Sequence, residues 1–327
     1  MDLRIGFLGV AHMHAYGYAQ AIASLEGLEA VGVWDDKIER AQRFWESMGI
    51  EVYPERDRLL NDVDAVIICS ENTRHVEIGQ AAAQARKHIL CEKPLVTDLV
   101  AGQAWLEECR SAGVKLMTAF PCRYSPAFGR LREAVESGIL GRLVAICSTN
   151  RGSCPFDWFV DTELSGGGAM IDHTVHVVDL LRALLGTDPV RVQAQTGNLM
   201  YAEAWEDTAM LTLEYDNGFF ATLDSSWSRP KSYKTWGDVT MNAVFEQGVI
   251  ELDLFNQHLD VYRNESMRHG LAGYGSDLDR LLVADFLRCI REDSEPTVTG
   301  EDGLAASRIA LAAYESVRRG SAVQIVA

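Results

Sequence analysis

The stretch AVIICSENTRHVEIGQAAAQARKHILCEKPLVT, residues 65–97, contains two short apolar runs, 65–69 and 88–91, with a helical segment between them. Continuous apolar runs of this length, bounded by polar residues, are typical of parallel strands that are buried on both faces. Loops that follow such strands lie at the sheet edge where ligands bind. We therefore expect the polar residues after the two runs to meet at one edge. They are Ser70, Asn72, His75, Glu92 and Lys93.

The sequence on either side of this stretch continues the alternation of strands and helices. Strands are predicted at 3–8, 30–34, 51–53 and 114–119, and helices at 11–25, 37–48, 56–61 and 97–112. Six strands alternating with helices predict a doubly wound parallel sheet, a Rossmann domain of the α/β class. We expect this domain to span residues 1–121, because two prolines, Pro121 and Pro126, mark the end of the alternation.

The second half of the chain has longer strand-like segments and few helices. Strands are predicted at 143–149, 190–196, 208–215, 218–226, 238–245, 249–254 and 259–263. Asp216-Asn217-Gly218 between two of them is a strong hairpin signal. We expect an α+β domain over residues 122–327 with a large, mostly antiparallel sheet, and packing helices at 276–290 and 303–317. One face of the sheet can cover a substrate, and the other can pair with a second subunit.

Length and composition narrow the class of protein. A chain of 327 residues favours two domains, and a net charge of -17 argues against nucleic acid or an anionic membrane surface as partner. The seven cysteines form no CxxC pair, which is typical of free thiols in a reducing compartment. The chain contains no run of 18 apolar residues. We therefore expect a cytoplasmic protein.

The first strand leads into the turn Gly9-Val10-Ala11-His12-Met13-His14, which keeps only the first glycine of the dinucleotide-binding pattern G-x-G-x-x-G. Alanine at the second position still permits fairly close approach of a pyrophosphate to the helix N-terminus, whereas histidine at the third is bulky. His12 or His14 could donate hydrogen bonds to a phosphate or reach the substrate. Each could equally be a solvated loop residue.

The second predicted strand ends in Asp35-Asp36. A carboxylate at this position accepts hydrogen bonds from the adenosine ribose and repels a 2'-phosphate, so Asp35 favours NAD over NADP. The alternative is an ordinary strand end, in which Asp36 caps the next helix.

A second cluster of polar residues follows the glycine run Gly166-Gly167-Gly168, which lets the backbone pass close to a ligand or another domain. Asp172, His176 and Asp179 share one face of the helix predicted there, and a carboxylate one turn before a histidine can fix its tautomer. Taken alone, this pattern also fits a capping aspartate and core histidines. Asp172 and His173 are neighbours that point in different directions, so no metal site is predicted here.

The motifs Asn72-x-x-His75 and Glu92-Lys93-Pro94 resemble those of the Gfo/Idh/MocA family, the relatives of glucose-fructose oxidoreductase and inositol dehydrogenase. Arg123-Tyr124, the glycine run and Asp172-x-x-x-His176 follow in the family's order. The sequence departs from the family at Glu71, where a proline is usual. The resemblance implies that the catalytic residues are Lys93, Asp172 and His176. It implies cofactor contacts from Gly9, Ala11, His12, Met13, Asp35, Ser70, Asn72, His75, Glu92 and Lys93. We expect substrate contacts from Lys93, Arg123, Tyr124, Trp158, Asp172 and His176.

These residues predict an NAD-dependent dehydrogenase that acts on a secondary alcohol of a sugar, cyclitol or related polyol and uses no metal. His176 would remove the hydroxyl proton, Lys93 would stabilise the alkoxide, and Asp172 would orient the pair. A homodimer or homotetramer through the second sheet is expected. Two other classes stay open, because some relatives are NAD-dependent glycoside hydrolases that oxidise the sugar transiently, and others are sugar sensors without catalysis.

Overall fold

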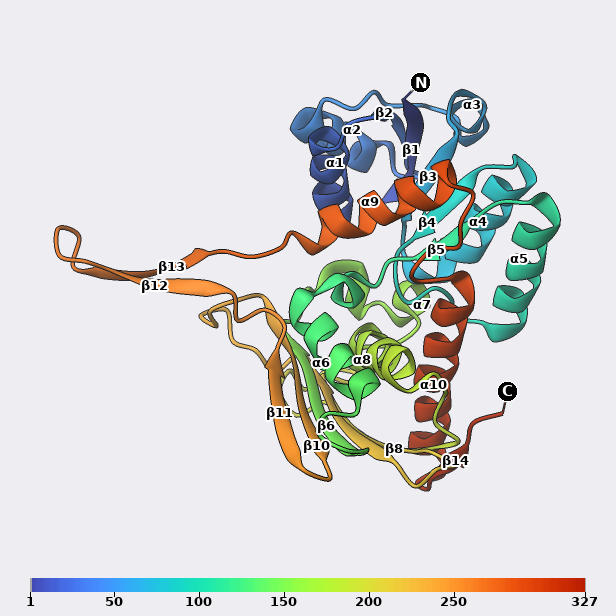
Figure 1. Cartoon of the computed structure of the whole chain (residues 1–327). Coiled ribbons are helices and arrows are strands. Elements are labelled where there is room, and N and C mark those ends of the chain that lie inside the picture. The colour runs from blue at the N-terminus through green and yellow to red at the C-terminus, as the bar shows by residue number, and fades with distance from the viewer. Residues whose placement is uncertain (1, 327) are drawn as a thin grey trace.

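The computed structural model describes residues 2–326, and over these residues the strands form two large sheets and one separate hairpin (Figure 1). The first sheet has the strand order β2-β1-β3-β4-β5, and all its strands are parallel. Its strands are β1 (Leu3–Val10), β2 (Leu28–Trp34), β3 (Ala65–Cys69), β4 (His88–Cys91) and β5 (Leu116–Thr118). The order reverses between β1 and β3, which places the ligand crevice at their carboxyl ends. This topology confirms the predicted Rossmann domain.

Two details of this sheet differ from the prediction. Residues 51–53 form no strand of the sheet and make a single parallel bridge, between Val52 and Val33. Pro54 follows at once, and a proline has no N–H to continue a ladder. The first helix begins at His14 rather than at residue 11, because residues 11–13 form the turn. The helices of this half are α1 (His14–Ser24), α2 (Ile38–Met48), α3 (Arg56–Asp62), η1 (Asn72–Arg74), α4 (His75–Gln84) and α5 (Leu99–Ala112).

The second sheet has the order β11-β10-β6-β9-β8-β7-β14. Its strands are β6 (Leu143–Gly152), β7 (Arg191–Gly197), β8 (Thr208–Glu214), β9 (Phe220–Ser226), β10 (Gly237–Phe245), β11 (Gly248–Asp253) and β14 (Val323–Gln324). Most pairs are antiparallel, as predicted, but β6 and β9 are parallel. Alternating apolar residues indicate a strand and its buried face, and they do not indicate the direction of its neighbour.

Helices cover one face of the second sheet and build the larger apolar core with it (Figure 1). The helical segments of this half are η2 (Pro121–Tyr124), α6 (Pro126–Ser137), η3 (Asp157–Val160), α7 (Thr162–Ser165), α8 (Ala169–Leu185), α9 (Leu278–Arg291) and α10 (Gly300–Arg319). Helix α9 returns to the first domain, where Leu282 and Phe286 join the apolar cluster that contains Ile5 and Tyr18. No helix within residues 2–326 is both long and apolar enough to cross a membrane.

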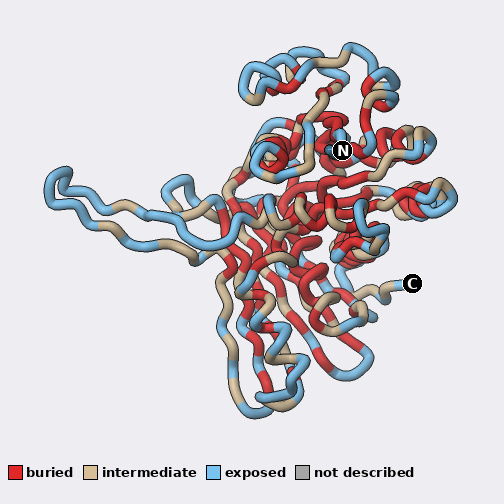
Figure 2. Tube along the Cα trace, turned by 45° about the horizontal axis from the view of Figure 1, so that its top comes forward, coloured by how far each residue is buried: buried red, intermediate tan, exposed pale blue. Residues whose placement is uncertain are grey.

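The predicted strand 259–263 does not belong to the second sheet. It forms β12 (His258–Arg263), which pairs only with β13 (Arg268–Gly273) in a hairpin that projects from the body and is mostly exposed (Figures 1 and 2). The second strand of this hairpin was not predicted, because RHGLAG contains two glycines and no alternating pattern. The hairpin returns the chain to the junction between the two domains.

Candidate active site

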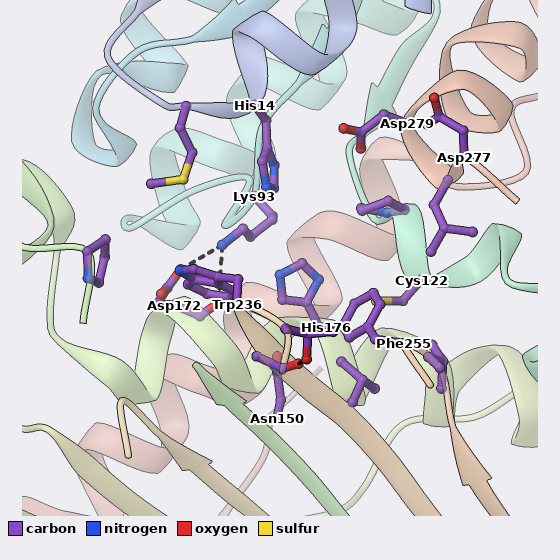
Figure 3. Close-up of a pocket in the computed structure, with 18 of the residues that line it drawn as sticks. His14, Lys93, Cys122, Asn150, Asp172, His176, Trp236, Phe255, Asp277 and Asp279 are labelled. Carbon is purple, nitrogen blue, oxygen red and sulfur yellow. Dashed lines mark hydrogen bonds and ion pairs between the residues drawn. The ribbon is translucent and has the colours of Figure 1, made fainter. Parts of the chain in front are cut away.

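A cavity of about 600 Å³ lies at the junction of the two domains, within the usual range for small-molecule sites. The turn after β1 and Lys93 contribute the lining from the first domain. The lining from the second half comes from helix α8, from the sheet residues Asn150 and Val239, and from the segment 274–279. Figure 3 shows Lys93, Asp172 and His176 around this one space. The structure therefore brings together three residues that are far apart in the sequence.

Lys93 and Asp172 form a buried ion pair at one side of the cavity. Lys93 Nζ lies 2.6 Å from Asp172 Oδ1, and Trp227 Nε1 donates to Asp172 Oδ2 at 3.0 Å. Burial opposes ionisation of Asp172, but Lys93, His173 and the hydrogen bond from Trp227 together outweigh it and hold the pKa of Asp172 well below its usual range. The pair is therefore a fixed lysine–carboxylate unit whose ammonium reaches the cavity.

The glycine run places the start of helix α8 against other parts of the chain. Gly168 N and Met170 N donate to Glu206 Oε1 at 2.7 and 3.3 Å, which satisfies free donors at the helix start. A Cβ atom on Gly166 would lie 2.5 Å from Thr97 of the first domain, and Gly166 has a φ of 81°. The run thus permits a close approach between domains, which was one of its two predicted roles.

His176 lies one turn after Asp172 and lines the same cavity. The prediction that Asp172 fixes its tautomer is wrong, because the carboxylate of Asp172 is bonded to Lys93 and Trp227 instead. Within the described residues His176 Nδ1 has no hydrogen-bond partner. Burial and then the charge of Lys93 hold the pKa of His176 well below its usual value. At neutral pH the imidazole is uncharged and can accept a proton.

The turn after β1 lies against the loop after β3, at the edge of the first sheet. Gly9 has a φ of 79°, and a Cβ there would lie 2.7 Å from the Cβ of Ser70, so only glycine fits. His12 N donates to Cys69 O at 2.9 Å. The side of the cavity formed by this turn consists of His12, Met13 and His14. Ala11 does not line the cavity, and its carbonyl oxygen accepts a hydrogen bond from Trp158 Nε1 at 3.1 Å.

Glu92 is buried beneath this turn and accepts several hydrogen bonds. Its Oε1 accepts a hydrogen bond from the Tyr18 hydroxyl and lies 3.0 Å from His14 Nδ1. Its Oε2 accepts a hydrogen bond from Lys93 N at 3.0 Å. Burial opposes its charge, but the nearby histidines hold the pKa of Glu92 well below its usual value. Glu92 therefore supports the turn from below, with His14 between it and the cavity.

The side chains of His12, His14 and Glu92 could in principle hold a metal, since one ligand atom of each lies within 4.8 Å of the others. His12 Nδ1, however, accepts a hydrogen bond from His14 N at 3.2 Å. A neutral imidazole that accepts at Nδ1 carries its proton on Nε2, the nitrogen that faces Glu92 at 3.9 Å. To bind a metal through Nε2, His12 would need an unprotonated Nε2 and an Nδ1 that donates a hydrogen bond. The cluster thus fits a hydrogen-bonded carboxylate better than a metal centre.

Asp35 is held at the carboxyl end of β2 by backbone donors. Its Oδ2 accepts from Val10 N at 2.8 Å, and its Oδ1 accepts from Lys37 N at 2.8 Å and from Arg40 Nε at 2.9 Å. Arg40 also donates to Glu71 Oε1 at 2.7 Å, a partner that the sequence pattern did not indicate. The side chain of Asp36 does not cap α2, and it pairs with Arg40.

The loop residues Ser70, Asn72 and His75 are buried next to the cavity and do not line it. Asn72 Nδ2 donates to Ser165 O at 2.9 Å, which ties this loop to the second domain. His75 Nδ1 lies 3.0 Å from Pro94 O, and this contact joins the two loops predicted to meet. The Ser70 hydroxyl donates to Glu71 O at 3.2 Å. In this structure all three position the backbone at the sheet edge.

Arg123, Tyr124 and Trp158 do not reach the cavity, so the structure does not support their predicted substrate contacts. Arg123 donates to both oxygens of Asp179 at 2.6 and 2.9 Å, and the Tyr124 hydroxyl donates to Asp285 at 2.8 Å. Trp158 stacks on Phe159 with ring centroids 3.9 Å apart. This part of the cavity is lined instead by residues from strands and loops of the second half: Asn150, Thr235, Trp236, Phe255 and Gln257.

A substitution of Arg123 tests this structural role. Arg123→Met leaves the buried carboxylate of Asp179 without its main partner, and such a loss costs about 3–5 kcal/mol. We expect a markedly lower melting temperature, measured by calorimetry, with little change in KM for substrate. A large rise in KM with an unchanged melting temperature would contradict this structural role and support the predicted contact between Arg123 and the substrate.

Comparisons with known proteins cover both domains. Residues 3–120 match the family model described as "Oxidoreductase family, NAD-binding Rossmann fold", and residues 128–251 match the model described as "GFO/IDH/MocA C-terminal domain". Together the two models span more than half of the chain.

Individual relatives match over nearly the full length. The chain is 28% identical to a myo-inositol 2-dehydrogenase of Thermotoga maritima, over 99% of this chain and 98% of that protein. It is 30% identical to a D-xylose 1-dehydrogenase (NADP(+)) of Haloferax volcanii, over 99% and 100%. The crystal structure of a probable dehydrogenase from Thermotoga maritima superposes with a TM-score of 0.85 at 28% identity, over 99% of both chains. The chain therefore belongs to the Gfo/Idh/MocA family of oxidoreductases.

Proposed function

We propose that this oxidoreductase is an NAD-dependent dehydrogenase that transfers hydride between the nicotinamide and a secondary hydroxyl or keto group of a sugar, cyclitol or related polyol. The observation that carries the proposal is the meeting of Lys93, Asp172 and His176 in one cavity beside the turn after β1. The relatives named above act on an inositol and a sugar, which supports the same class of substrate.

The residues at the edge of the first sheet fit a dinucleotide. Gly9 permits a turn that any side chain would obstruct, and the turn leads directly into the N-terminus of α1, where a pyrophosphate binds favourably. Asp35 stands where the adenosine ribose hydroxyls are recognised, and Asp36 and Glu71 lie near it around Arg40. Three carboxylates around one guanidinium disfavour a further phosphate, so we assign NAD rather than NADP.

In the proposed oxidation, His176 accepts the proton of the substrate hydroxyl, for which its uncharged imidazole is suited. Lys93 stabilises the negative charge that develops on the same oxygen, and Asp172 fixes the position of the lysine ammonium. Trp227 in turn fixes Asp172. When bound, the nicotinamide accepts the hydride, so the protein contributes position, charge and proton transfer.

The open face of the second sheet supports an assembly of several subunits. Exposed apolar side chains on strands β8, β9, β10 and β11 lie on the face that the helices leave uncovered: Met210, Phe220, Val244 and Val249. Apolar patches of this kind mark interfaces between proteins. A homodimer or homotetramer formed through this face would bury them.

Absorbance at 340 nm tests the function. We expect purified protein with NAD to produce NADH from at least one member of a panel of inositols and neutral sugars. NADP should serve about 100-fold less well or worse, because its 2'-phosphate would lie beside like charges. Release of free sugar from a glycoside without net NADH would instead identify a hydrolase. Bound NAD with neither reaction would identify a sugar sensor.

A further inference from the structure

Trp236 stands in the loop before β10 and lines the cavity. It is 50% exposed, whereas the other tryptophans of the second domain, Trp158, Trp205 and Trp227, are buried. Removing apolar surface from water is favourable, and an indole offers more of it than almost any other side chain. An uncovered indole inside a small-molecule site is therefore a surface for a ligand to cover.

Contacts on several sides hold Trp236 in place. Gly152 at the end of β6 packs directly on the indole, because a Cβ atom there would lie 2.7 Å from Trp236 Cη2. The ring of His173 on α8 meets the indole at 88°, with ring centroids 5.6 Å apart. In the main chain, Ser153 N donates to Trp236 O at 3.2 Å. The indole is thus fixed before a ligand arrives, so little conformational entropy is lost on binding.

The same histidine links the indole to the groups proposed to react. His173 Nε2 lies 3.3 Å from Asp172 Oδ2, and Asp172 Oδ1 lies 2.6 Å from Lys93 Nζ. Figure 3 shows Trp236 beside Asp172 and Lys93, with His176 in the lining of the same cavity. The indole therefore borders the space in which the substrate hydroxyl must meet Lys93 and His176.

An indole recognises the faces of a polyol ring rather than its rim. In a six-membered ring in the chair form, equatorial hydroxyls point outward and leave both faces lined by axial C–H bonds. These weakly positive hydrogens suit the electron-rich face of an aromatic ring. An axial hydroxyl on the stacked face would hold the ring away from the indole and lose hydrogen bonds to water there. Stacking thus needs one face free of axial hydroxyls.

We propose that Trp236 stacks on one face of the substrate ring and limits the substrates to pyranoses and cyclitols that have a face free of axial hydroxyls. This inference rests on the proposed dehydrogenase function and narrows its substrate class. The stacking contact is the same in the bound substrate and in the transition state, so it acts mainly on KM. Open-chain polyols have no such face and are expected to be poor substrates.

Three inositols that differ only in configuration test this selection. Of these, scyllo-inositol has no axial hydroxyl, myo-inositol has one, and D-chiro-inositol has one on each face. Glucose, galactose and gulose form the same series for the hydroxyls at carbons 2, 3 and 4 of a pyranose. With NAD at neutral pH, we expect the KM of the third member to exceed that of the first by about 10-fold, the scale of one aromatic stacking contact. The second member keeps one clear face and should lie within about threefold of the first.

Substitutions of Trp236 identify the residue responsible. Trp236→Leu removes the flat aromatic face, so the KM of the first member should rise about 10-fold and the difference within a series should fall to about twofold. The kcat should change little, because Lys93, Asp172 and His176 remain. Trp236→Phe has a smaller ring and should keep part of the preference. Trp45→Leu is the matched control, since Trp45 is 51% exposed on α2 outside the cavity, and it should reproduce the parent.

Equal use of all members of a series by the parent, or a preference that Trp236→Leu retains, would overturn the stacking and leave the proposed function intact. Absence of NADH from every polyol would count against the proposed function. Calorimetric titration of NAD-loaded protein with the first and third members then decides the stacking separately. Tighter binding of the first member by the parent and not by Trp236→Leu supports it, and equal or undetectable binding overturns it.

Discussion

Lys93→Met is expected to lower kcat by about 10³-fold, the effect of removing one preorganised group that stabilises a developing oxyanion. Lys93 Nζ is the cationic group of the cavity that can approach the reacting oxygen, and Asp172 holds it there. Steady-state rates at saturating NAD and substrate measure the loss. NAD affinity, read by fluorescence titration, should change far less.

Two further variants separate the chemical effect of Lys93→Met from loss of stability. The single substitution leaves Asp172 as a buried, unpaired charge, a change that costs about 3–5 kcal/mol. Adding Asp172→Asn removes that charge, so the double variant should regain stability and stay inactive. Lys231→Met, at an exposed loop lysine, is the matched control and should keep full activity. A Lys93→Met enzyme that turns over within about threefold of the parent would refute the role of Lys93.

His176→Asn is expected to lower kcat by about 10²–10³-fold at neutral pH, because general base catalysis contributes on this scale. The parent enzyme should also have a characteristic pH profile. Since the folded-state pKa of His176 lies well below 6.5, its proton-accepting form dominates at pH 7, and activity should fall only at pH values well below 6.5. The variant should lose this acidic decline.

Rates measured across pH for parent and variant check this prediction. His269→Asn, on the projecting hairpin, is the control and should reproduce the parent profile. The same acidic decline in His176→Asn as in the parent would assign the titration to another group and contradict the role of His176 as base.

The sequence predicted most accurately those elements that are buried on all sides. The strands 65–69 and 88–91 were predicted at their observed bounds, because a continuous apolar run ends where the chain leaves the core. Helix α8 was similarly evident from its glycine run and apolar face. These elements carry the loop of Lys93 and the pair Asp172 and His176, so the centre of the site followed from local patterns.

The partners of each side chain could not be predicted in the same way. Arg123 was expected at the substrate because it lies near the domain junction, but Asp179, 56 residues away, occupies it. Asp172 was expected to orient His176, but Trp227 and Lys93 take its oxygens from other elements. Such contacts depend on the three-dimensional packing of distant segments, and the periodicity of apolar residues along the chain does not indicate which side chains will meet.

Transfer of deuterium from substrate to cofactor is the most direct test of the proposed reaction. A polyol found to be oxidised is labelled at the reacting carbinol carbon and incubated with the enzyme and NAD, and the reduced cofactor is analysed by mass spectrometry. Hydride transfer in the cavity of Lys93, Asp172 and His176 predicts NADH that carries one deuterium, at a rate that falls with Lys93→Met and His176→Asn. Unlabelled cofactor, or labelled cofactor formed equally fast by both variants, would contradict it.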